Sequence, residues 1–432
     1  MSTLLLEGGL VVPLDGARTR PAPMDVLVRA GRIEALLHRE ADRTRPADAE
    51  IVDCRGRIVL PGLVNAHLHP ELHLLRGMLE DLSLHEWPGC LPLQRSLEVL
   101  DGPAGEPLQR AAVRAALAEC ALAGATQVVC YGVSCRIERI AAEELAALGL
   151  HGWVTIRDAA FAPAESSRPH MYRLHAEEAL TETELTSASE AHARGEWIVM
   201  HVAETRERVE LARERFGTTP IRLLARYGLL SPRVLLSHAV HVDDEEIDLI
   251  AAARAPVLAS PVAEAKLADG LAPVDAMHRR GVRVALGTDA AVCNNTCDLL
   301  LEARTLGLLQ RLSSGAGALP AETLLRFATV DGAAALEHPA AAGLAPGAPA
   351  DIVMLDAAAP HMLPLVHRGA GSNLFASIVF SGSGRDVTDV MVQGRWVVRE
   401  RRLVPADGTA IAAGLQAAAE ELLDRTGRAH GA

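Results

Sequence analysis

Short apolar runs separated by turn residues and charges fill both ends of the chain. Runs of this kind, divided by Gly, Pro and polar residues, predict strands of an antiparallel sheet. They lie at Leu10–Val12, Asp25–Val28, Arg32–Leu36 and Arg57–Leu60, and again at Asp351–Leu355, Val387–Val392 and Trp396–Val398. Because the two ends share one texture, we expect residues 1–60 and 341–432 to meet in one β-rich domain, with a helix at the C-terminus.

Between these ends, over residues 61–340, apolar strands alternate with helical stretches rich in Ala and Leu. This alternation is typical of a parallel α/β sheet or barrel. Seven strands are predicted: one ending near Asn65, then Gln127–Cys130, Gly152–Ile156, Trp197–His201, Val234–His238, Ala255–Ala259 and Val282–Asp289. An eight-stranded ring is the natural closure, so we predict an α/β fold with a (β/α)8 TIM barrel in which one strand is either irregular or not visible in the pattern.

Composition excludes several classes of partner. The chain has 432 residues, 49% of them hydrophobic, and a net charge of -13, which is unfavourable for binding nucleic acid or an anionic membrane. No stretch approaches 18 uncharged apolar residues, and the N-terminus lacks the basic region of a signal peptide. Seven cysteines without a secretory signal fit a reduced, cytoplasmic protein. We therefore expect a small-molecule partner.

Candidate metal ligands follow several of the predicted strands. His67 and His69 are separated by one residue, so in a strand both project from the same face. One such pair occurs by chance in many proteins. His201, His238 and Asp289, however, also stand at strand ends, where barrels of this type place their chemistry. A His and carboxylate set without Cys suits one divalent metal ion, with zinc favoured and iron(II) as the alternative.

Glu204 lies three residues after His201 and has two interpretations. It could be an acidic residue that caps the helix leaving the strand. Beside a water molecule on a metal, the same carboxylate would carry protons.

These residues stand in motifs that resemble those of the amidohydrolase superfamily, in particular its branch of aminohydrolases and chlorohydrolases. The matching segments are Pro61–His69, Leu74–Gly77, His201–Thr205, Ser237–His241, Gly287–Asp289 with Asn294 and Asn295, Gly343–Asp351 and Val392–Gly394. The last two segments resemble the superfamily's return into a composite β-sandwich, so the resemblance implies that both chain ends form such a domain. As a set, the motifs are specific for the superfamily and much less so for the substrate.

The resemblance implies the role of each matching residue. One divalent metal would be bound by His67, His69, His201 and Asp289. Glu204 would transfer a proton to a ring nitrogen of the substrate, His238 would hydrogen-bond the attacking water, and His238 or Asp289 would take its proton. Members with two metals carry a carboxylated lysine after the fourth barrel strand. We assign that position to Val154–Asp158, which contains no lysine, and so expect a single metal.

The predicted function is hydrolytic deamination of an amino-substituted N-heterocycle such as a purine, pyrimidine, pterin or triazine. Water made nucleophilic by the metal would attack the carbon that bears the amino group, and ammonia would leave. Two alternatives are hydrolytic displacement of chloride or an alkylamine, and a metal-binding relative without turnover. We further expect a homo-oligomer, either a dimer or a tetramer.

The substrate contacts depart from the pattern of the superfamily. Members that deaminate nucleosides hold the ribose with a Glu, but here the segment that begins at Trp87 ends in Gln94. Glu264 stands where a Ser-Asn pair is common. It could pair with an amino-rich substrate or form a salt bridge with Lys266. Arg76 and His170 complete the predicted substrate contacts, together with Trp87, Gln94 and Glu264.

Overall fold

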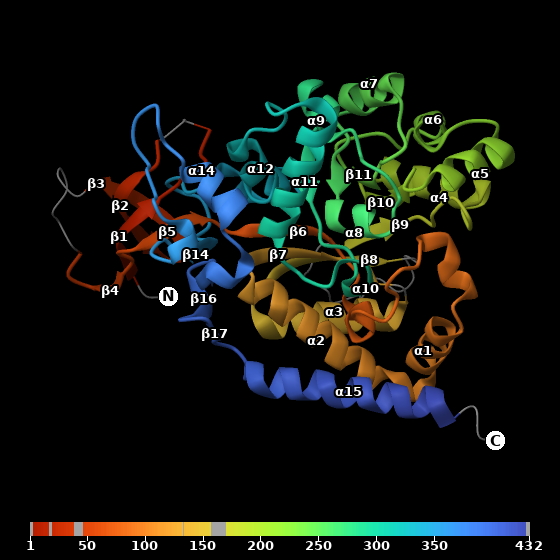
Figure 1. The fold of residues 1–432 in the computed structure, drawn as a ribbon, viewed down its shortest axis with the longest axis horizontal. Helices are drawn as coiled ribbons and strands as arrows, with labels where there is room; N and C mark the ends of the chain where they lie inside the picture. Colours follow the sequence, from red (N-terminus) through yellow and green to blue (C-terminus); the bar gives the residue numbers. More distant parts are fainter. Residues whose placement is uncertain (1–2, 17–19, 39–45, 133, 157–169, 429–432) are drawn as a thin grey trace.

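The computed structural model describes residues 3–16, 20–38, 46–132, 134–156 and 170–428. It consists of a barrel of parallel strands surrounded by helices and a mixed sheet at one side (Figure 1). Both predicted parts of the fold are therefore confirmed. Across the described ranges, no helix is long and apolar enough to cross a membrane.

Eight parallel strands form the barrel in the order of the sequence. They are β6 (Leu63–Leu68), β7 (Ala125–Cys130), β8 (His151–Ile156), β9 (His170–Arg173), β10 (Trp197–Val202), β11 (Val234–His238), β12 (Val257–Ala259) and β13 (Val284–Leu286). The seven predicted strands are all present. The eighth is β9, a four-residue strand whose sequence His-Met-Tyr-Arg has no apolar run that would mark it.

The ring closes between β13 and β6 through individual hydrogen bonds. The amide of Asp289 donates to the carbonyl of His67 over 2.9 Å. Asn65 is fully buried, and its side chain joins both sides of the seam. Its Nδ2 donates to Oγ1 of Thr288 over 2.7 Å, and its Oδ1 accepts from the Thr288 amide over 3.1 Å. These contacts fix the end of β6 beside the end of β13.

Replacing Asn65 with Ala should therefore destabilise the barrel. The change leaves the buried Thr288 amide and hydroxyl without their partner, which costs about 1–3 kcal/mol for each unsatisfied group. Urea unfolding should show a lower midpoint, whereas Gln416→Ala, on an exposed helix surface, should leave it unchanged. An Asn65→Ala midpoint equal to that of the wild type would show that the seam does not depend on this side chain.

Helices cover the outside of the barrel and extend its loops. They are α1 (Leu91–Asp101), α2 (Glu106–Leu122), α3 (Cys135–Leu148), α4 (Glu182–Ala193), α5 (Arg206–Phe216), α6 (Pro220–Arg226), α7 (Asp244–Ala253), α8 (Pro261–Lys266), α9 (Val274–Arg279), α10 (Ala291–Asn294), α11 (Leu299–Ser314), α12 (Ala321–Phe327) and α13 (Val330–Ala335). Helix α2 ends before Gly124, whose φ of +100° suits glycine and turns the chain into β7.

Strands from both ends of the chain share the second sheet, in the order β17-β16-β15-β14-β5-β1-β2-β3, with β4 also paired to β1. Their bounds are β1 (Thr3–Val11), β2 (Ala22–Arg29), β3 (Arg32–His38), β4 (Ala49–Asp53), β5 (Arg57–Pro61), β14 (Ile352–Asp356), β15 (Val387–Val392), β16 (Arg395–Arg399) and β17 (Arg402–Leu403). The sheet is mixed rather than purely antiparallel, because β4 and β5 both run parallel to β1. Apolar residues of both ends share one buried core, which includes Leu4, Val26 and Ile352.

The terminal helix α15 (Gly408–Arg428) lies along α2 and α1 rather than on the sheet (Figure 1). Its Ala418 and Leu422 are buried in a cluster with Leu74, Leu100 and Leu108. The helix thus supports the long segment between β6 and α2, which covers one side of the barrel mouth.

Candidate metal centre and active site

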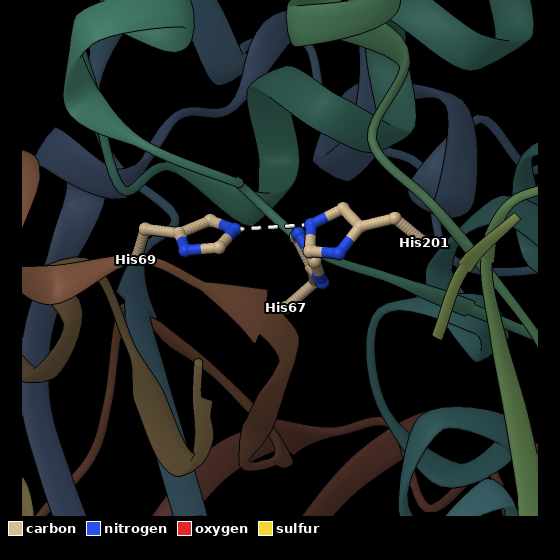
Figure 2. A group of neighbouring side chains, drawn as sticks. All are labelled: His67, His69 and His201. Carbon is tan, nitrogen blue, oxygen red and sulfur yellow. Dashed lines mark hydrogen bonds between the residues drawn. The ribbon is translucent and has the colours of Figure 1, made fainter. Parts of the chain in front are cut away.

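Five predicted residues converge at the carboxyl ends of the barrel strands. His67 lies in β6, His69 directly after it, His201 in β10, His238 at the end of β11, and Asp289 just after β13. The rings of His67, His69 and His201 point toward one another (Figure 2). The convergence inferred from strand ends is therefore present in the folded chain.

The distances between these side chains fit a metal ion. Nε2 of His69 lies 3.1 Å from Nε2 of His201, and Oδ1 of Asp289 lies 3.4 Å from Nε2 of His67 and 3.6 Å from Nε2 of His69. Tetrahedral ligands about 2.05 Å from zinc are themselves about 3.3 Å apart. Nε2 of His67 is buried and has no hydrogen-bond partner among the described residues. These donor atoms thus surround a point where a cation would satisfy all of them.

The protonation of the set also suits a metal. Burial lowers the pKa of His69 to about 3 and lowers the pKa values of His67 and His201, so the three imidazoles are neutral and offer lone pairs. Burial alone would raise the pKa of Asp289, but the neighbouring histidines, His67 first among them, outweigh burial and hold this pKa below its usual range. Asp289 therefore contributes a carboxylate.

His67 is oriented from behind by two hydroxyl groups. Its Nδ1 lies 3.2 Å from Oγ of Ser237, and this oxygen lies 2.6 Å from the hydroxyl of Tyr131. All three side chains are fully buried. Such partners of a metal-binding imidazole fix its tautomer and its ring plane.

Removing the Ser237 hydroxyl should weaken metal binding. We expect Ser237→Ala to reduce the affinity for Zn²⁺ by about 10-fold to 100-fold, because His67 loses the acceptor for its Nδ1 proton. Competition with a chromophoric chelator would measure the change. Ser313→Ala, at an exposed position of α11, is the matched control, and equal affinities in the two variants would contradict a role for Ser237.

Glu204 lies beside this centre, between the guanidinium group of Arg208 and the imidazole of His238. Its Oε2 accepts a hydrogen bond from Nη1 of Arg208, one turn later in α5. Its Oε1 is 3.7 Å from Nε2 of His238. The carboxylate is almost fully buried, and it also borders the cavity described below. It can therefore reach a substrate while its orientation is fixed from two sides.

His238 is held by carboxylates on two sides. Nδ1 of His238 lies 3.5 Å from Oε1 of Glu264, and this oxygen also accepts from the Ser260 amide over 2.9 Å. Burial alone would lower the pKa of His238, but Glu204, Glu264 and Asp289 outweigh it and raise this pKa to about 10. The backbone of His238 is left-handed, with a φ of 71°. Strained backbone of this kind is common where a side chain is aimed into a functional site.

Two adjoining cavities open next to the centre. The first, of about 310 Å³, contains His69, His201, Glu204 and Asp289 in its wall. The second, of about 510 Å³, is mainly apolar and is lined by Leu84, His85, Trp87, Pro88, Leu93, Gln94, Leu97, Glu178, Thr205, Glu207, Arg208 and Leu211. Leu84, Trp87, Glu178 and Arg208 border both. We call these the reaction chamber and the side chamber.

The predicted substrate contacts are only partly brought together. Trp87 separates the two chambers, and Gln94 lines the side chamber while its Nε2 donates to the carbonyl of Pro88. Arg76 instead pairs with Glu119. His170 is exposed at the first residue of β9, at the end of the strand away from the mouth.

Glu264 does not line either chamber. It is buried behind His238, and Lys266 pairs with Glu80 rather than with it. The structure therefore places Glu264 where it orients an imidazole. The alternative salt bridge is replaced by the pair between Lys266 and Glu80, and a substrate contact of Glu264 stays a prediction.

The presence of β9 also corrects the strand numbering. Val154–Ile156 belong to the third barrel strand, and Arg157 and Asp158 lie outside the described residues. The fourth strand is β9, which ends in Arg173. Lys266 is the only lysine of the whole sequence, and it pairs with Glu80. No lysine is therefore available for carboxylation at the corrected position.

Three basic side chains that line the reaction chamber were not predicted from the sequence. Arg173 and His175 line it from the end of β9, and Arg208 from α5. His175 donates its backbone amide to Glu184 over 2.8 Å, and its Nδ1 lies 2.9 Å from the same carboxylate oxygen. Only Arg208 left a signal in the sequence, since it stands four residues after Glu204, the spacing at which helical side chains meet.

A barrel of parallel strands with a His and Asp set at its mouth is an architecture of metal-dependent hydrolases. The sequence profile described as "Amidohydrolase family" matches residues 58–397. The chain therefore belongs to the amidohydrolase family.

Named relatives match along nearly the whole chain. A 5-methylthioadenosine/S-adenosylhomocysteine deaminase of Halobacterium salinarum is 34% identical, with 98% of this chain and 99% of that protein covered. A 5'-deoxyadenosine deaminase of Methanosarcina acetivorans is 29% identical, with 98% and 99% covered. Among solved structures, an adenosine deaminase from Xanthomonas campestris with bound zinc has a TM-score of 0.87 and 26% identity, with 97% and 98% covered.

Proposed function

We propose that this protein is a hydrolytic deaminase of an amino-substituted N-heterocycle and that the reaction takes place in the reaction chamber. The observation that carries the proposal is the placement of Glu204 in the wall of the same cavity as His69, His201 and Asp289. A proton carrier and a metal-type donor set thus face one substrate-sized space. The names of the relatives support deamination of purine nucleosides in particular.

We propose that His67, His69, His201 and Asp289 hold one divalent metal ion, zinc in the first place, with iron(II) as the alternative. The zinc in the Xanthomonas adenosine deaminase supports this choice. When bound, such an ion lowers the pKa of a water molecule and so supplies a nucleophile at neutral pH. Since the imidazoles are neutral and buried, they need no deprotonation before binding it.

The remaining steps fall to side chains of the chain itself. Asp289 is the candidate to take the proton of the attacking water, and His238, whose raised pKa keeps it protonated at neutral pH, would orient that water. Glu204 would give a proton to the ring nitrogen next to the attacked carbon and regain one from the newly added hydroxyl group, while the proton taken from the water passes to the amino group, which leaves as ammonia. Arg208 would act as a positioning residue, because it holds Oε2 of Glu204 and leaves Oε1 on the side of His238.

We propose that the side chamber receives a substituent of the heterocycle. Its apolar wall, with Leu93, Leu97 and Leu211, suits an alkyl or thioether group, and Gln94 offers a neutral amide in place of the Glu that holds ribose in nucleoside deaminases. A nucleoside modified at its 5' position carries such a group, in agreement with the names of the relatives.

A larger side chain in the side chamber should weaken binding of substrates that carry the substituent but not of substrates that lack it. We expect Leu211→Trp to raise KM for a 5'-alkylthio nucleoside by about 10-fold, the order of effect of a few methylene groups, and to leave KM for the bare base unchanged. Val404→Trp, at a position after β17 that is 55% exposed, is the control. Equal changes in KM for both substrates would show that the chamber does not bind the substituent.

An ammonia-release screen tests the proposed reaction. Metal-loaded protein should release ammonia from at least one amino-substituted purine, pyrimidine, pterin or triazine. Release of chloride or an alkylamine without ammonia would favour the alternative displacement reaction. Absence of turnover across the panel in metal-loaded protein would favour a relative without catalysis.

We also propose that the protein acts in the cytoplasm as a homo-oligomer, a dimer or a tetramer. The seven cysteines form no disulfide bond among the described residues, as expected in a reducing compartment. Leu308 and Leu312 are exposed on α11 and offer apolar surface for a second copy.

A further inference from the structure

A second group of metal-type side chains lies where the barrel meets the sheet. His151 is the first residue of β8, at the end of the strand opposite the reaction chamber. His338 follows α13, and Asp351 directly precedes β14. The two imidazole rings are 4.6 Å apart, and one ligand atom from each of the three residues lies within 4.8 Å of the others. Three separate segments therefore bring their donors to one place.

Asp351 is fixed so that one oxygen faces the two histidines. Its side chain is only 1% exposed, and Oδ1 accepts from the Gln393 amide over 2.7 Å. Its backbone carbonyl accepts from the amide of Gly62, which connects β5 to β6. The remaining oxygen, Oδ2, lies 3.3 Å from Nε2 of His151. The carboxylate therefore cannot turn toward another partner without giving up these bonds.

The contact between Asp351 and His151 is not a hydrogen bond. Both Oδ2 of Asp351 and Nε2 of His151 are buried and lack a hydrogen-bond partner among the described residues. Leaving a buried carboxylate oxygen and a ring nitrogen unsatisfied is costly, and a cation between them would satisfy both. The 3.3 Å separation matches the about 3.3 Å expected between two ligands of a tetrahedral zinc ion.

We propose that His151, His338 and Asp351 form a second divalent-metal site, of the zinc class, that joins the barrel to the β-sheet domain. Two imidazoles and a carboxylate are ligands that such an ion prefers. Both histidines are partly exposed, so solvent can deliver the ion and complete its coordination. The site lies away from the reaction chamber and has a structural role, since it ties β8, the end of α13 and the start of β14 together.

Binding at this site requires one small rearrangement. Nδ1 of His338 accepts a long hydrogen bond of 3.2 Å from the Ala340 amide. If His338 binds the ion through Nε2, its ring proton lies on Nδ1. Nδ1 can then no longer accept from the Ala340 amide, and this hydrogen bond is lost when the bond to the metal forms. The site therefore binds its ion together with a local adjustment of His338.

Metal stoichiometry tests the proposal. The full-length protein is stripped with a chelator, reloaded with Zn²⁺ and freed of excess ion by gel filtration before elemental analysis. We expect two equivalents per chain in the wild type and one in each of Asp351→Asn and His338→Gln. Asp351→Asn keeps a side-chain oxygen that can accept from the Gln393 amide, and His338→Gln changes a partly exposed side chain. Each variant is therefore expected to fold, for a different reason.

Two further proteins complete the experiment. His361→Gln alters an exposed histidine that pairs with Asp386, and it should keep both equivalents. The double variant His67→Asn/His69→Asn should keep the equivalent at the second site, which separates this proposal from that of the reaction chamber. In thermal unfolding, Zn²⁺ should raise Tm of this double variant, but not when Asp351→Asn is added.

A double variant that binds no zinc would overturn the proposal, as would equal zinc content in the wild type, Asp351→Asn and His338→Gln. Loss of deaminase activity in Asp351→Asn at full occupancy of the first site would contradict its purely structural role.

Discussion

Replacing Glu204 with Gln is expected to lower kcat by about 100-fold to 10,000-fold, the usual contribution of a positioned proton donor. The amide keeps the size of the side chain but cannot deliver a proton to a ring nitrogen. Because Glu204 is not one of the proposed ligands, zinc content should remain that of the wild type. Steady-state kinetics on the substrate found in the ammonia screen, with elemental analysis of the same samples, would measure both effects.

Glu204→Gln also removes the ion pair with Arg208, so a second variant is needed to separate the loss of the ion pair from the loss of the proton donor. Arg208→Gln breaks the same ion pair but leaves the carboxylate in place. If Glu204 carries the proton, Arg208→Gln should lose less kcat than Glu204→Gln. Glu210→Gln, an exposed change on the same helix, should have no effect. Equal losses in the first two variants would reduce Glu204 to a structural partner, and full activity in Glu204→Gln would remove it from the reaction.

Removing the metal should abolish turnover altogether. The proposed nucleophile is a water molecule that the ion held by His67, His69, His201 and Asp289 activates. Dialysis against a chelator is expected to bring activity below detection, and Zn²⁺ should restore it. Activity measured against added Zn²⁺ would show whether recovery follows occupancy of this site.

The variant His201→Asn gives this prediction its control. This variant removes one proposed metal ligand and changes no other residue of either chamber. Recovery of activity should then require a much higher Zn²⁺ concentration than in the wild type. Asp351→Asn, which alters only the second group, should recover at the same metal concentration as the wild type. Chelated protein that keeps its activity would contradict a metal-dependent reaction.

Much of the centre could be predicted because its residues are tied to regular elements. His67 and His69 follow a strand with a clear apolar run, and His201, His238 and Asp289 follow three more. Parallel strands in a barrel end at one face, so position at a strand end is sufficient to bring such residues together. The composite sheet could be predicted for a related reason, since short apolar strands at both ends need a common core.

The residues that shape the chambers could not be predicted in this way. Arg173 and His175 follow β9, whose four residues carry no apolar run. Glu264 reads as a rim residue next to Lys266, yet the short helix α8 buries it behind His238. Contacts of this kind depend on how loops and short helices pack, which local periodicity does not encode.

The most direct test of hydrolytic deamination is the fate of oxygen from the solvent. The substrate is converted in ¹⁸O-labelled water by metal-loaded protein, and product mass and ammonia are measured together. The proposed reaction predicts one ¹⁸O atom in each product molecule and one ammonia for each substrate consumed, with both products formed about 100-fold to 10,000-fold more slowly in Glu204→Gln. Ammonia without ¹⁸O in the product, or labelled product formed with release of chloride or an alkylamine instead of ammonia, would contradict it.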